Sequence, residues 1–357
     1  MLHLIAALLA ICQMVTAATI PVKDSNGRIA PKVLIVSMFE PEAEIWYKNM
    51  PGSGLGDLLA VNISTPGLSM LYPHVHCVAD YSVCQYSTLG GVAIARYAVQ
   101  VLQYELDARE MPENFTTGYF PYGKTQPNQY AANQYGTEVM ELNENLREIA
   151  YALASKAHLA DSDEAAQYRA RYKSTNDLAA ATLGPSVVKC DTATSDVYYS
   201  GKLLSEGFEN ITEVWTNGTG RYCMTAQEDS AALEVLVRMA VWRLVDFARV
   251  IVMRTGSNFD RPPPDVSAYE HLAVLHQNGF RIAIQNLFNA GVEIVKGILE
   301  EWDSTFENGI KPSNYIGDVF GSLGGQPDFG PGSLTGGKGV VGGVWSSSVV
   351  EAREYGR

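Results

Sequence analysis

The hydrophobic positions of the chain fall into short unbroken runs and longer spaced patterns. Residues 32–38, KVLIVSM, form an unbroken apolar run that is typical of a strand buried on both faces. The next stretch, FEPEAEIWYKN, carries Pro41 and acidic residues that suit the first turn of a helix. Further runs predict strands at Ser69–Val78, Val92–Val101, Val187–Asp191, Glu213–Trp215 and Arg249–Arg254.

Apolar residues spaced by three and four positions predict helices in the remaining segments. These helices are expected at Thr137–Lys156, Asp163–Tyr172, Ser195–Glu206, Glu228–Val245 and Arg281–Trp302. Strands that alternate with helices indicate an α/β sandwich around one central sheet. The glycine-rich, aperiodic tail at 333–357 is expected to be disordered.

The first residues form a pattern of their own. An apolar core runs from Leu4 to Cys12 and small residues follow up to Ala18, which predicts a secretory signal peptide over residues 1–18. The alternative, an N-terminal membrane anchor, is disfavoured because the run is short and Gln13 interrupts it. No other segment is expected to span a membrane, and the protein is expected to be secreted or held in the cell wall.

The charge of the chain limits the kinds of molecule that it can bind. The 357 residues carry a formal net charge of -13 with no cluster of Lys and Arg, which argues against a nucleic-acid partner. Four N-glycosylation sequons agree with export; they begin at Asn62, Asn114, Asn210 and Asn217.

Four cysteines remain in the mature chain, and they allow three pairings. The preferred set joins Cys77 to Cys84, which are close in sequence, and Cys190 to Cys223. Free buried thiols are the alternative, and an oxidising compartment disfavours them.

The sequence contains no recognisable motif for a metal or cofactor site. His74 and His76 face the same side of a predicted strand, but no third ligand follows at a recognisable spacing. The chain also lacks a G-x-S-x-G nucleophile elbow, and the glycines of PGSGLGD do not lie between a strand and a helix. Neither a metal nor a cofactor is expected.

Three polar clusters remain, each at the end of a predicted strand or the start of a helix. They are CMTAQEDSAALEVL, CDTATSDVYYSG, and the stretch ARVIVMRTGSNFDRPPPD. Ligands of open α/β sheets bind outside the carboxyl ends of strands. The clusters offer carboxylates, an aromatic face and an amide, a set that suits a nucleoside. Ordinary polar turns and helix-dipole partners are the alternative for each cluster.

These same segments carry a family resemblance. CDTATSDVYYSGKLLSEGFEN, TNGTGRYCMTAQEDSA, MRTGSNFDRP and NYIGDVFGSLGGQPDFGPG closely resemble the fungal purine nucleoside permease (NUP) family. That family is distantly similar to nucleoside phosphorylases and nucleosidases. The resemblance implies a single domain over 31–332, folded as a three-layer α/β/α sandwich with a mixed central sheet.

The resemblance also implies roles for particular residues. Glu228, with Gln227 beside it, would hold the ribose hydroxyls, and Tyr198 would lie near the base. Asn258 stands where nucleosidases have an aspartate that protonates the departing purine, and Asp260 is the nearest replacement acid. The resemblance also implies that Glu40 or Glu42 lies near the ribose or an attacking water.

The chain departs from the family after Gln85. Cys84 and Gln85 pass directly into YSTLGGVAIARYAVQ, so several dozen residues, including a central strand, are expected to be missing. Losing a central strand leaves backbone groups of its neighbours unpaired. Either a neighbouring segment repairs the sheet or the sequence reflects a splicing or gene-model error.

Three functions follow, in order of preference. The first is a secreted protein that binds a purine nucleoside (inosine, guanosine or adenosine) and passes it to a membrane transporter. The second is an extracellular purine nucleosidase or phosphorylase. The third is a storage or surface glycoprotein that has lost the site.

Overall fold

The structure is a computed structural model. It describes residues 32–37, 40–55, 81–82, 85–100, 103–115, 117–132, 134–195 and 198–329. Several sequence predictions lie outside these residues: the signal peptide, the strand at Ser69–Val78, the histidine pair, Cys77, Cys84, the sequon at Asn62 and the tail at 333–357.

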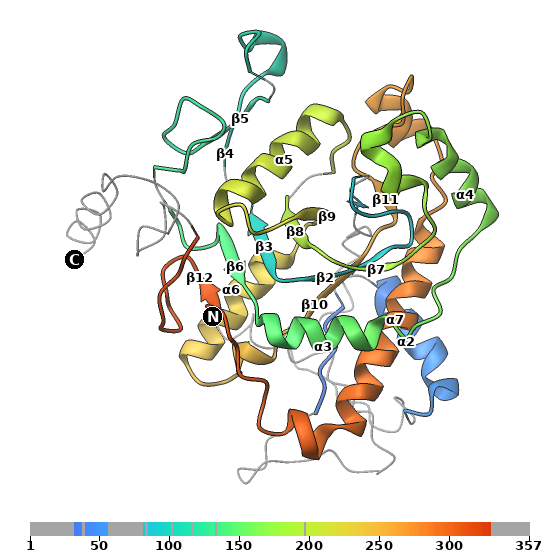
Figure 1. The fold of residues 1–357 in the computed structure, drawn as a ribbon, viewed down its shortest axis with the longest axis vertical. Helices are drawn as coiled ribbons and strands as arrows, with labels where there is room; N and C mark the ends of the chain where they lie inside the picture. Colours follow the sequence, from blue (N-terminus) through green and yellow to red (C-terminus); the bar gives the residue numbers. More distant parts are fainter. Residues whose placement is uncertain are drawn as a thin grey trace, which may run out of the picture.

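A mixed sheet of seven strands forms the centre of the fold (Figure 1). Its strand order is β11-β1-β9-β8-β3-β6-β12, with parallel pairing of β3 with β8, β8 with β9, and β1 with β11. The strands are β1 (Tyr81–Ser82), β3 (Tyr97–Gln100), β6 (Val139–Glu141), β8 (Asp191–Thr194), β9 (Tyr222–Ala226), β11 (Asn258–Phe259) and β12 (Gly317–Asp318).

The other strands of the described residues form two smaller sheets. One has the order β10-β2-β7, and the other is the β4–β5 hairpin, which projects from the body in Figure 1. Their strands are β2 (Val92–Ala95), β7 (Val187–Lys189), β10 (Val252–Thr255), β4 (Gln103–Glu105) and β5 (Tyr119–Pro121).

The three-stranded and seven-stranded sheets are joined by two bent strands. Arg96 alone separates β2 from β3, and Cys190 alone separates β7 from β8. The buried carboxylate of Asp191 fixes the bend, because it accepts hydrogen bonds from the backbone N–H groups of Arg96, Tyr97 and Arg221 at 2.7–2.9 Å. The chain therefore turns from one sheet into the other without leaving these backbone donors unpaired.

Helices cover both faces of the seven-stranded sheet. On β3, Tyr97 and Val99 pack in a cluster with Ile211 and Trp215 of α5, whereas Ala98 packs with Leu233 of α6. Successive side chains of a strand point to opposite faces, so α5 and α6 lie on opposite sides. The predicted three-layer α/β/α arrangement with a mixed central sheet is confirmed. The helices are α2 (Glu40–Ser53), α3 (Glu144–Ala154), α4 (Asp163–Arg169), α5 (Lys202–Trp215), α6 (Asp229–Val241) and α7 (Phe280–Glu300).

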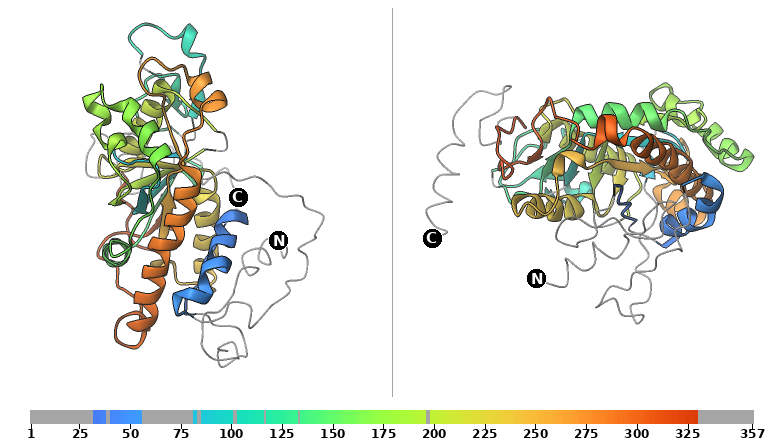
Figure 2. Two further views of the ribbon diagram at one scale, coloured as in Figure 1. Left: turned by 90° about the vertical axis from the view of Figure 1, so that its right-hand side faces the viewer. Right: turned by 90° about the horizontal axis from the view of Figure 1, so that it is seen from below.

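The long helix α7 organises the core beneath the small sheet. Two of its glycines allow close contact: a Cβ on Gly291 would lie 2.8 Å from Trp46 of α2, and one on Gly297 would lie 2.3 Å from Leu153 of α3. Figure 2 shows α2 lying along α7. Of the described helices, α7 alone has the length and composition to cross a membrane, and 61% of its most apolar window is buried within the protein.

The first predicted strand is not a strand in the structure. Residues 33–37 have no regular structure, and Leu34 and Val36 are 43% and 42% exposed. A strand needs a neighbour to pair its backbone groups, and no described strand pairs with this segment. Two-residue β1 instead occupies the position between β9 and β11.

Three other predictions misplace an element. The strand predicted at Glu213–Trp215 is wrong, because Phe208, Ile211 and Trp215 continue the buried face of α5. The helix predicted from Thr137 begins only at Glu144, after the N-cap residue Asn143. The helix predicted at Ser195–Glu206 begins at Lys202.

Candidate functional site

Two parallel strands end side by side at the edge where the polar clusters lie. Thr194 of β8 pairs with Ala226 of β9, so the segments that follow both strands leave the sheet at the same level. Gln227 and Glu228 follow β9 directly, and the half-buried Tyr198 lies four residues beyond the end of β8. The structure therefore brings two of the three predicted clusters to one edge.

Asn258 reaches the same level on another strand. Tyr81 of β1 pairs with Thr225 of β9 on one side and with Asn258 of β11 on the other. Neighbouring strands are about 4.8 Å apart, so the backbone of Asn258 lies about 10 Å from that of Thr225. Asn258 is half-buried, and its Oδ1 accepts a hydrogen bond of 2.6 Å from Ser257 Oγ.

Glu228 lies at the N-terminus of α6, and its side chain does not cap that helix. It is the N-cap residue, yet its side chain makes no capping hydrogen bond. The carboxylate is 20% exposed, and its Oε2 lies 3.9 Å from Nη2 of Arg254. The carboxylate is therefore partly accessible, as a group that binds ribose hydroxyls would be.

Arg254 of β10 lies close to the carboxylates of both Glu228 and its neighbour Asp229. The Arg254 guanidinium donates to Oδ1 of Asp229 from Nε at 3.0 Å and also from Nη2. Both side chains are largely buried, at 12% and 3% exposure. Arg254 is not among the residues predicted from the sequence, although a charged residue within the apolar run VIVMRT is a signal that could have identified it.

Several buried polar atoms near this edge have no hydrogen-bond partner among the described residues. They include Thr194 Oγ1, Asp229 Oδ2 and Ser230 Oγ. Thr192 Oγ1 is also unpaired among the described residues, but it lies two residues back from the end of β8 and is not part of this group. Thr192 and Thr194 face α6, because Ala193 between them packs with Phe208 of α5 on the opposite face. Buried polar groups are normally paired, so this concentration of unpaired oxygen atoms makes the edge a candidate polar binding site.

Asp260 has a different environment from Asn258. Its side chain is fully buried, and Oδ2 accepts hydrogen bonds from Nε and Nη2 of Arg261 at 3.0 and 2.9 Å. Its backbone oxygen accepts from Ser205 and Gly201 at the start of α5. Asp260 therefore forms a buried ion pair with the residue that follows it in the chain. The catalytic role of Asp260 stays a prediction.

A buried histidine lies beside this ion pair. Nδ1 of His271 lies 2.7 Å from Ser200 Oγ, and Nε2 lies 3.5 Å from the hydroxyl of Tyr172. Burial is the main cause that lowers the pKa of His271 to about 4, against the opposing charge of Asp260. His271 is therefore neutral at physiological pH.

The structure places Glu40 and Glu42 on α2. Both lie in the first turn of α2, whose main packing partner is α7 through Trp46 and Met50. Their predicted place near the ribose stays untested. Among the described residues, no group of three or more His, Cys, Asp or Glu side chains is arranged to hold a metal ion.

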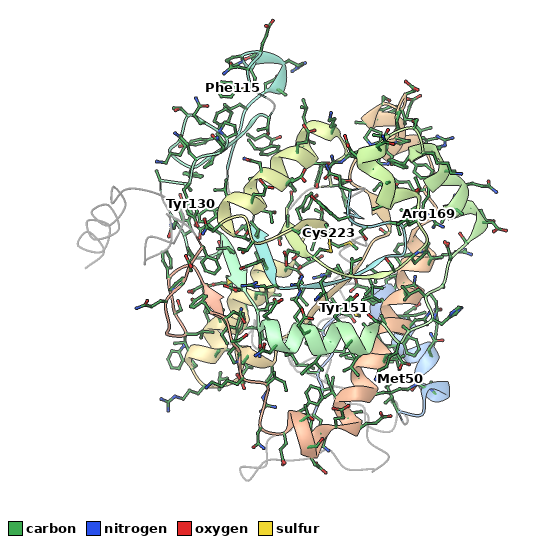
Figure 3. The ribbon with its side chains drawn as sticks, viewed as in Figure 1. Met50, Phe115, Tyr130, Tyr151, Arg169 and Cys223 are labelled. Atoms are coloured by element: carbon green, nitrogen blue, oxygen red, sulfur yellow. A yellow bond between two sulfur atoms is a disulfide. The ribbon has the colours of Figure 1, made fainter. Side chains whose placement is uncertain are left out.

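The predicted disulfide between Cys190 and Cys223 is confirmed, and its sulfur–sulfur bond lies near the centre of the molecule (Figure 3). It joins the start of β8 to β9, with the two Cα atoms 5.8 Å apart. The bond therefore ties together the two strands whose ends carry Tyr198 and Glu228.

The junction after Gln85 packs against α5. Tyr86 OH lies 3.4 Å from Glu209, and the Arg221 guanidinium lies over the Tyr86 ring at 5.1 Å. Burial raises the pKa of Glu209, and the charge of Arg261 opposes that shift. These contacts tie the junction to the ordered body of the protein.

Comparison with known proteins gives a family match over most of the chain. The model of the family described as "Purine nucleoside permease (NUP)" matches residues 30–88 and 85–311. A Candida albicans purine nucleoside permease is 41% identical over 348 residues, covering 84% of this chain and 83% of the relative. A Schizosaccharomyces pombe protein described as a probable purine nucleoside permease is 32% identical over 351 residues, covering 84% and 98%.

The alignments also bear on the missing segment. The family match falls into two pieces that meet at residues 85–88. The Candida alignment runs over 348 positions but takes in only 84% of this chain, so several dozen positions of the relative have no counterpart here. The break in the family match lies at the predicted junction after Gln85, and the Candida alignment agrees with the predicted number of missing residues.

Solved structures show a weaker likeness. A Neisseria meningitidis 5'-methylthioadenosine/S-adenosylhomocysteine nucleosidase is 14% identical with a TM-score of 0.28, covering 62% of this chain and 68% of the nucleosidase. The corresponding Helicobacter pylori enzyme is 11% identical with a TM-score of 0.30, covering 63% and 66%. Likeness at this level does not establish a common fold.

Proposed function

The chain belongs to the purine nucleoside permease family, and from this premise we propose that it captures purine nucleosides outside the cell and passes them to a membrane transporter. The ligand is inosine, guanosine or adenosine. In this proposal the site lies at the edge formed by the ends of β8 and β9 and by β11, and the nucleoside contacts Tyr198, Glu228 and Asn258.

The observation that carries this proposal is the set of buried, unpaired oxygen atoms at that edge. Thr194 Oγ1 and Asp229 Oδ2 lie beside the chain positions of the predicted ligand-binding residues. A buried polar atom without a partner destabilises the free protein by about 1–3 kcal/mol. Hydroxyl groups of a bound ribose would supply hydrogen bonds that the described part of the protein does not.

Each residue of the site has a definite task in this proposal. Glu228, partly exposed and close to Arg254, accepts hydrogen bonds from the ribose hydroxyls. Asn258 holds the purine through its amide, which can both donate and accept. Tyr198 supplies an aromatic face for the base.

The same residues favour binding over cleavage. General acid catalysis needs a group that can protonate the departing base. An asparagine cannot do so, and the neighbouring Asp260 is engaged with Arg261. The proposed site residues are therefore sufficient to bind a nucleoside, and binding does not need an acid.

The test is to incubate the purified protein with inosine and adenosine, with and without phosphate, while measuring binding by calorimetry and free base by chromatography. We expect saturable binding and no free base. Base released without phosphate would make the protein a nucleosidase, and release only with phosphate would make it a phosphorylase. Neither binding nor release would contradict the proposal and leave a storage or surface glycoprotein.

A further inference from the structure

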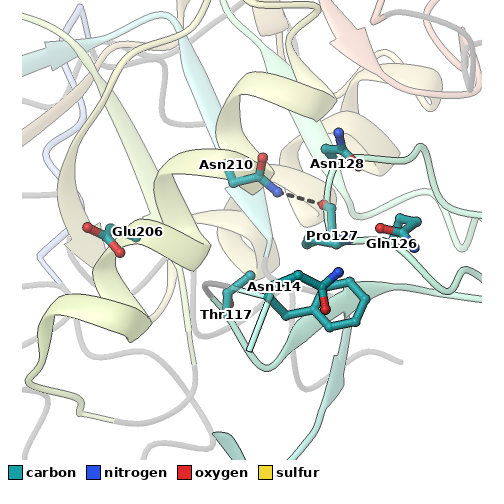
Figure 4. Close-up of a pocket in the computed structure, with 8 residues that line it drawn as sticks. Asn114, Thr117, Gln126, Pro127, Asn128, Glu206 and Asn210 are labelled. Atoms are coloured by element: carbon teal, nitrogen blue, oxygen red, sulfur yellow. Dashed lines mark hydrogen bonds between the residues drawn. The ribbon is translucent and has the colours of Figure 1, made fainter. Parts of the chain in front are cut away.

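A concave pocket lies at the base of the projecting β4–β5 hairpin (Figure 4). It has a volume of about 300 Å³, at the small end of the range for ligand pockets. Three segments form its walls: the loop before β5, the loop after β5, and the outer face of α5. The lining residues are Asn114, Phe115, Thr117, Gln126, Pro127, Asn128, Glu206 and Asn210.

The chemistry of this pocket is that of a sugar site. Four of the lining side chains are amides, which donate and accept hydrogen bonds as hydroxyl and acetamido groups do. Phe115 adds an apolar face, and its ring packs edge-on to Phe120 at 5.2 Å. No Lys, Arg or His lines the pocket, and Glu206 contributes a carboxylate. A neutral, hydroxyl-rich ligand fits this lining, whereas an anion does not.

The pocket wall contains two of the four sequon asparagines, and their environments differ. Nδ2 of Asn210 donates a 2.6 Å hydrogen bond to Pro127 O, and its sequon threonine, Thr212, is fully buried within α5. Asn114 is exposed, and nothing in the described part of the chain bonds to its amide. Of these two asparagines, Asn114 is therefore the one that can carry a bulky group without disturbing the fold.

We propose that Asn114 carries an N-linked glycan and that its first N-acetylglucosamine ring lies in this pocket. In the attachment step, Nδ2 of Asn114 forms a bond to C1 of the sugar and loses a proton. The bond that breaks joins C1 to the pyrophosphate of a lipid-linked oligosaccharide donor, which leaves as the lipid pyrophosphate.

The pocket geometry explains why the attached sugar would stay. Because Asn114 is itself part of the wall, the linked ring is at high effective concentration, and weak hydrogen bonds are enough to hold it. Gln126 and Asn128 line the pocket on the opposite loop, and Glu206 lines it on α5. Gly207 of α5 allows the loop before β5 to approach, since a Cβ there would lie 2.9 Å from Thr117 Oγ1.

The experiment expresses the full chain in a yeast host and locates glycans by peptide mass spectrometry after enzymatic release in heavy-oxygen water. We expect occupancy at Asn114 and none at Asn210, and loss of that glycan in Asn114→Gln but not in the matched control Asn308→Gln. An unmodified Asn114, or a glycan at Asn210 instead, would overturn the assignment.

A second measurement tests the docking of the sugar. In the double variant Gln126→Ala with Asn128→Ala, the glycan should still be attached, but an endoglycosidase should remove it from the folded protein about tenfold faster. Equal rates in the parent and the variant would show that the sugar does not lie in the pocket. Nucleoside binding is measured separately, so failure of this inference and failure of the proposed function are distinguishable.

Discussion

The Arg254 guanidinium donates to one oxygen of Asp229, with Nε 3.0 Å from Oδ1, and so joins β10 to the first residue of α6. The other oxygen of Asp229 is buried without a partner among the described residues. The pair fixes the helix start that carries Glu228 and leaves an acceptor facing the proposed site.

Replacing Arg254 with Met should destabilise the protein by about 3–5 kcal/mol, because the Asp229 carboxylate is left buried and uncompensated. Urea denaturation measures this change. The double variant Arg254→Met with Asp229→Asn should recover much of the loss, since the orphaned charge is gone. Equal stability of the single variant and the parent would show that the pair does not fix the start of α6.

Replacing Thr194 with Val should change stability and nucleoside affinity in opposite directions. The variant loses a buried, unpaired hydroxyl, so the free protein should be as stable as the parent or about 1 kcal/mol more stable. Affinity measured by calorimetry should fall about tenfold, because the hydroxyl is expected to bond to the ligand. The matched control is Thr192→Val, which removes an equivalent hydroxyl deeper in β8 and should leave affinity unchanged. A loss of affinity in both variants would contradict this account of the edge.

Removing the disulfide by the double change Cys190→Ala and Cys223→Ala should cost about 3–4 kcal/mol for a sequence separation of 33 residues. Thermal unfolding with and without a reductant provides the check. Reduction should lower the melting temperature of the parent and leave the double variant unaffected. A parent that is insensitive to complete reduction would show that the bond contributes no stability.

Lowering the pH should reduce the free energy of unfolding, because His271 takes up a proton more readily in the unfolded state. Its folded pKa of about 4 lies below the unfolded value of about 6.5, so the unfolded state binds the proton first as pH falls. The contribution is complete above pH 6.5 and is lost as pH falls toward 4, about 3 kcal/mol in all.

The comparison that isolates this effect is the parent against His271→Gln, with the free energy of unfolding measured at several pH values. Carboxyl groups whose pKa is raised by burial, such as those of Glu138 and Glu141, titrate in both proteins and cancel in the difference. Parallel pH profiles for the two proteins would refute the assignment to His271.

The fold was predictable wherever one buried face repeats over several turns or strands. The apolar spacing predicted α7 nearly to both of its ends, and the acidic residues after Phe39 predicted the first turn of α2 but not its length. The apolar run at 92–101 predicted β2 and β3 together but not the bend at Arg96. That bend depends on Asp191, which is 95 residues away in sequence. Likewise, nothing local distinguishes residues 33–37 from a buried strand, because only the absence of a paired neighbour decides the outcome.

The candidate site was predictable as three motifs but not as an arrangement. Resemblance identified Glu228 and Asn258, and only the pairing of both β9 and β11 with β1 places them at one edge. Arg254 and Thr194 were missed because their importance lies in what they contact or fail to contact, which a single sequence does not record. The roles given to Glu40, Glu42 and Asp260 stay predictions.

The most direct test of the central claim is the dissociation constant of inosine for the parent, Asn258→Ala and the matched control Asn308→Ala, measured by calorimetry on proteins of equal stability. Asn308 is an exposed turn residue distant in sequence from every predicted ligand group. The account predicts that Asn258→Ala abolishes measurable binding, whereas Asn308→Ala binds as the parent does. Unchanged affinity in Asn258→Ala would remove this residue from the site and contradict the proposed mode of purine recognition.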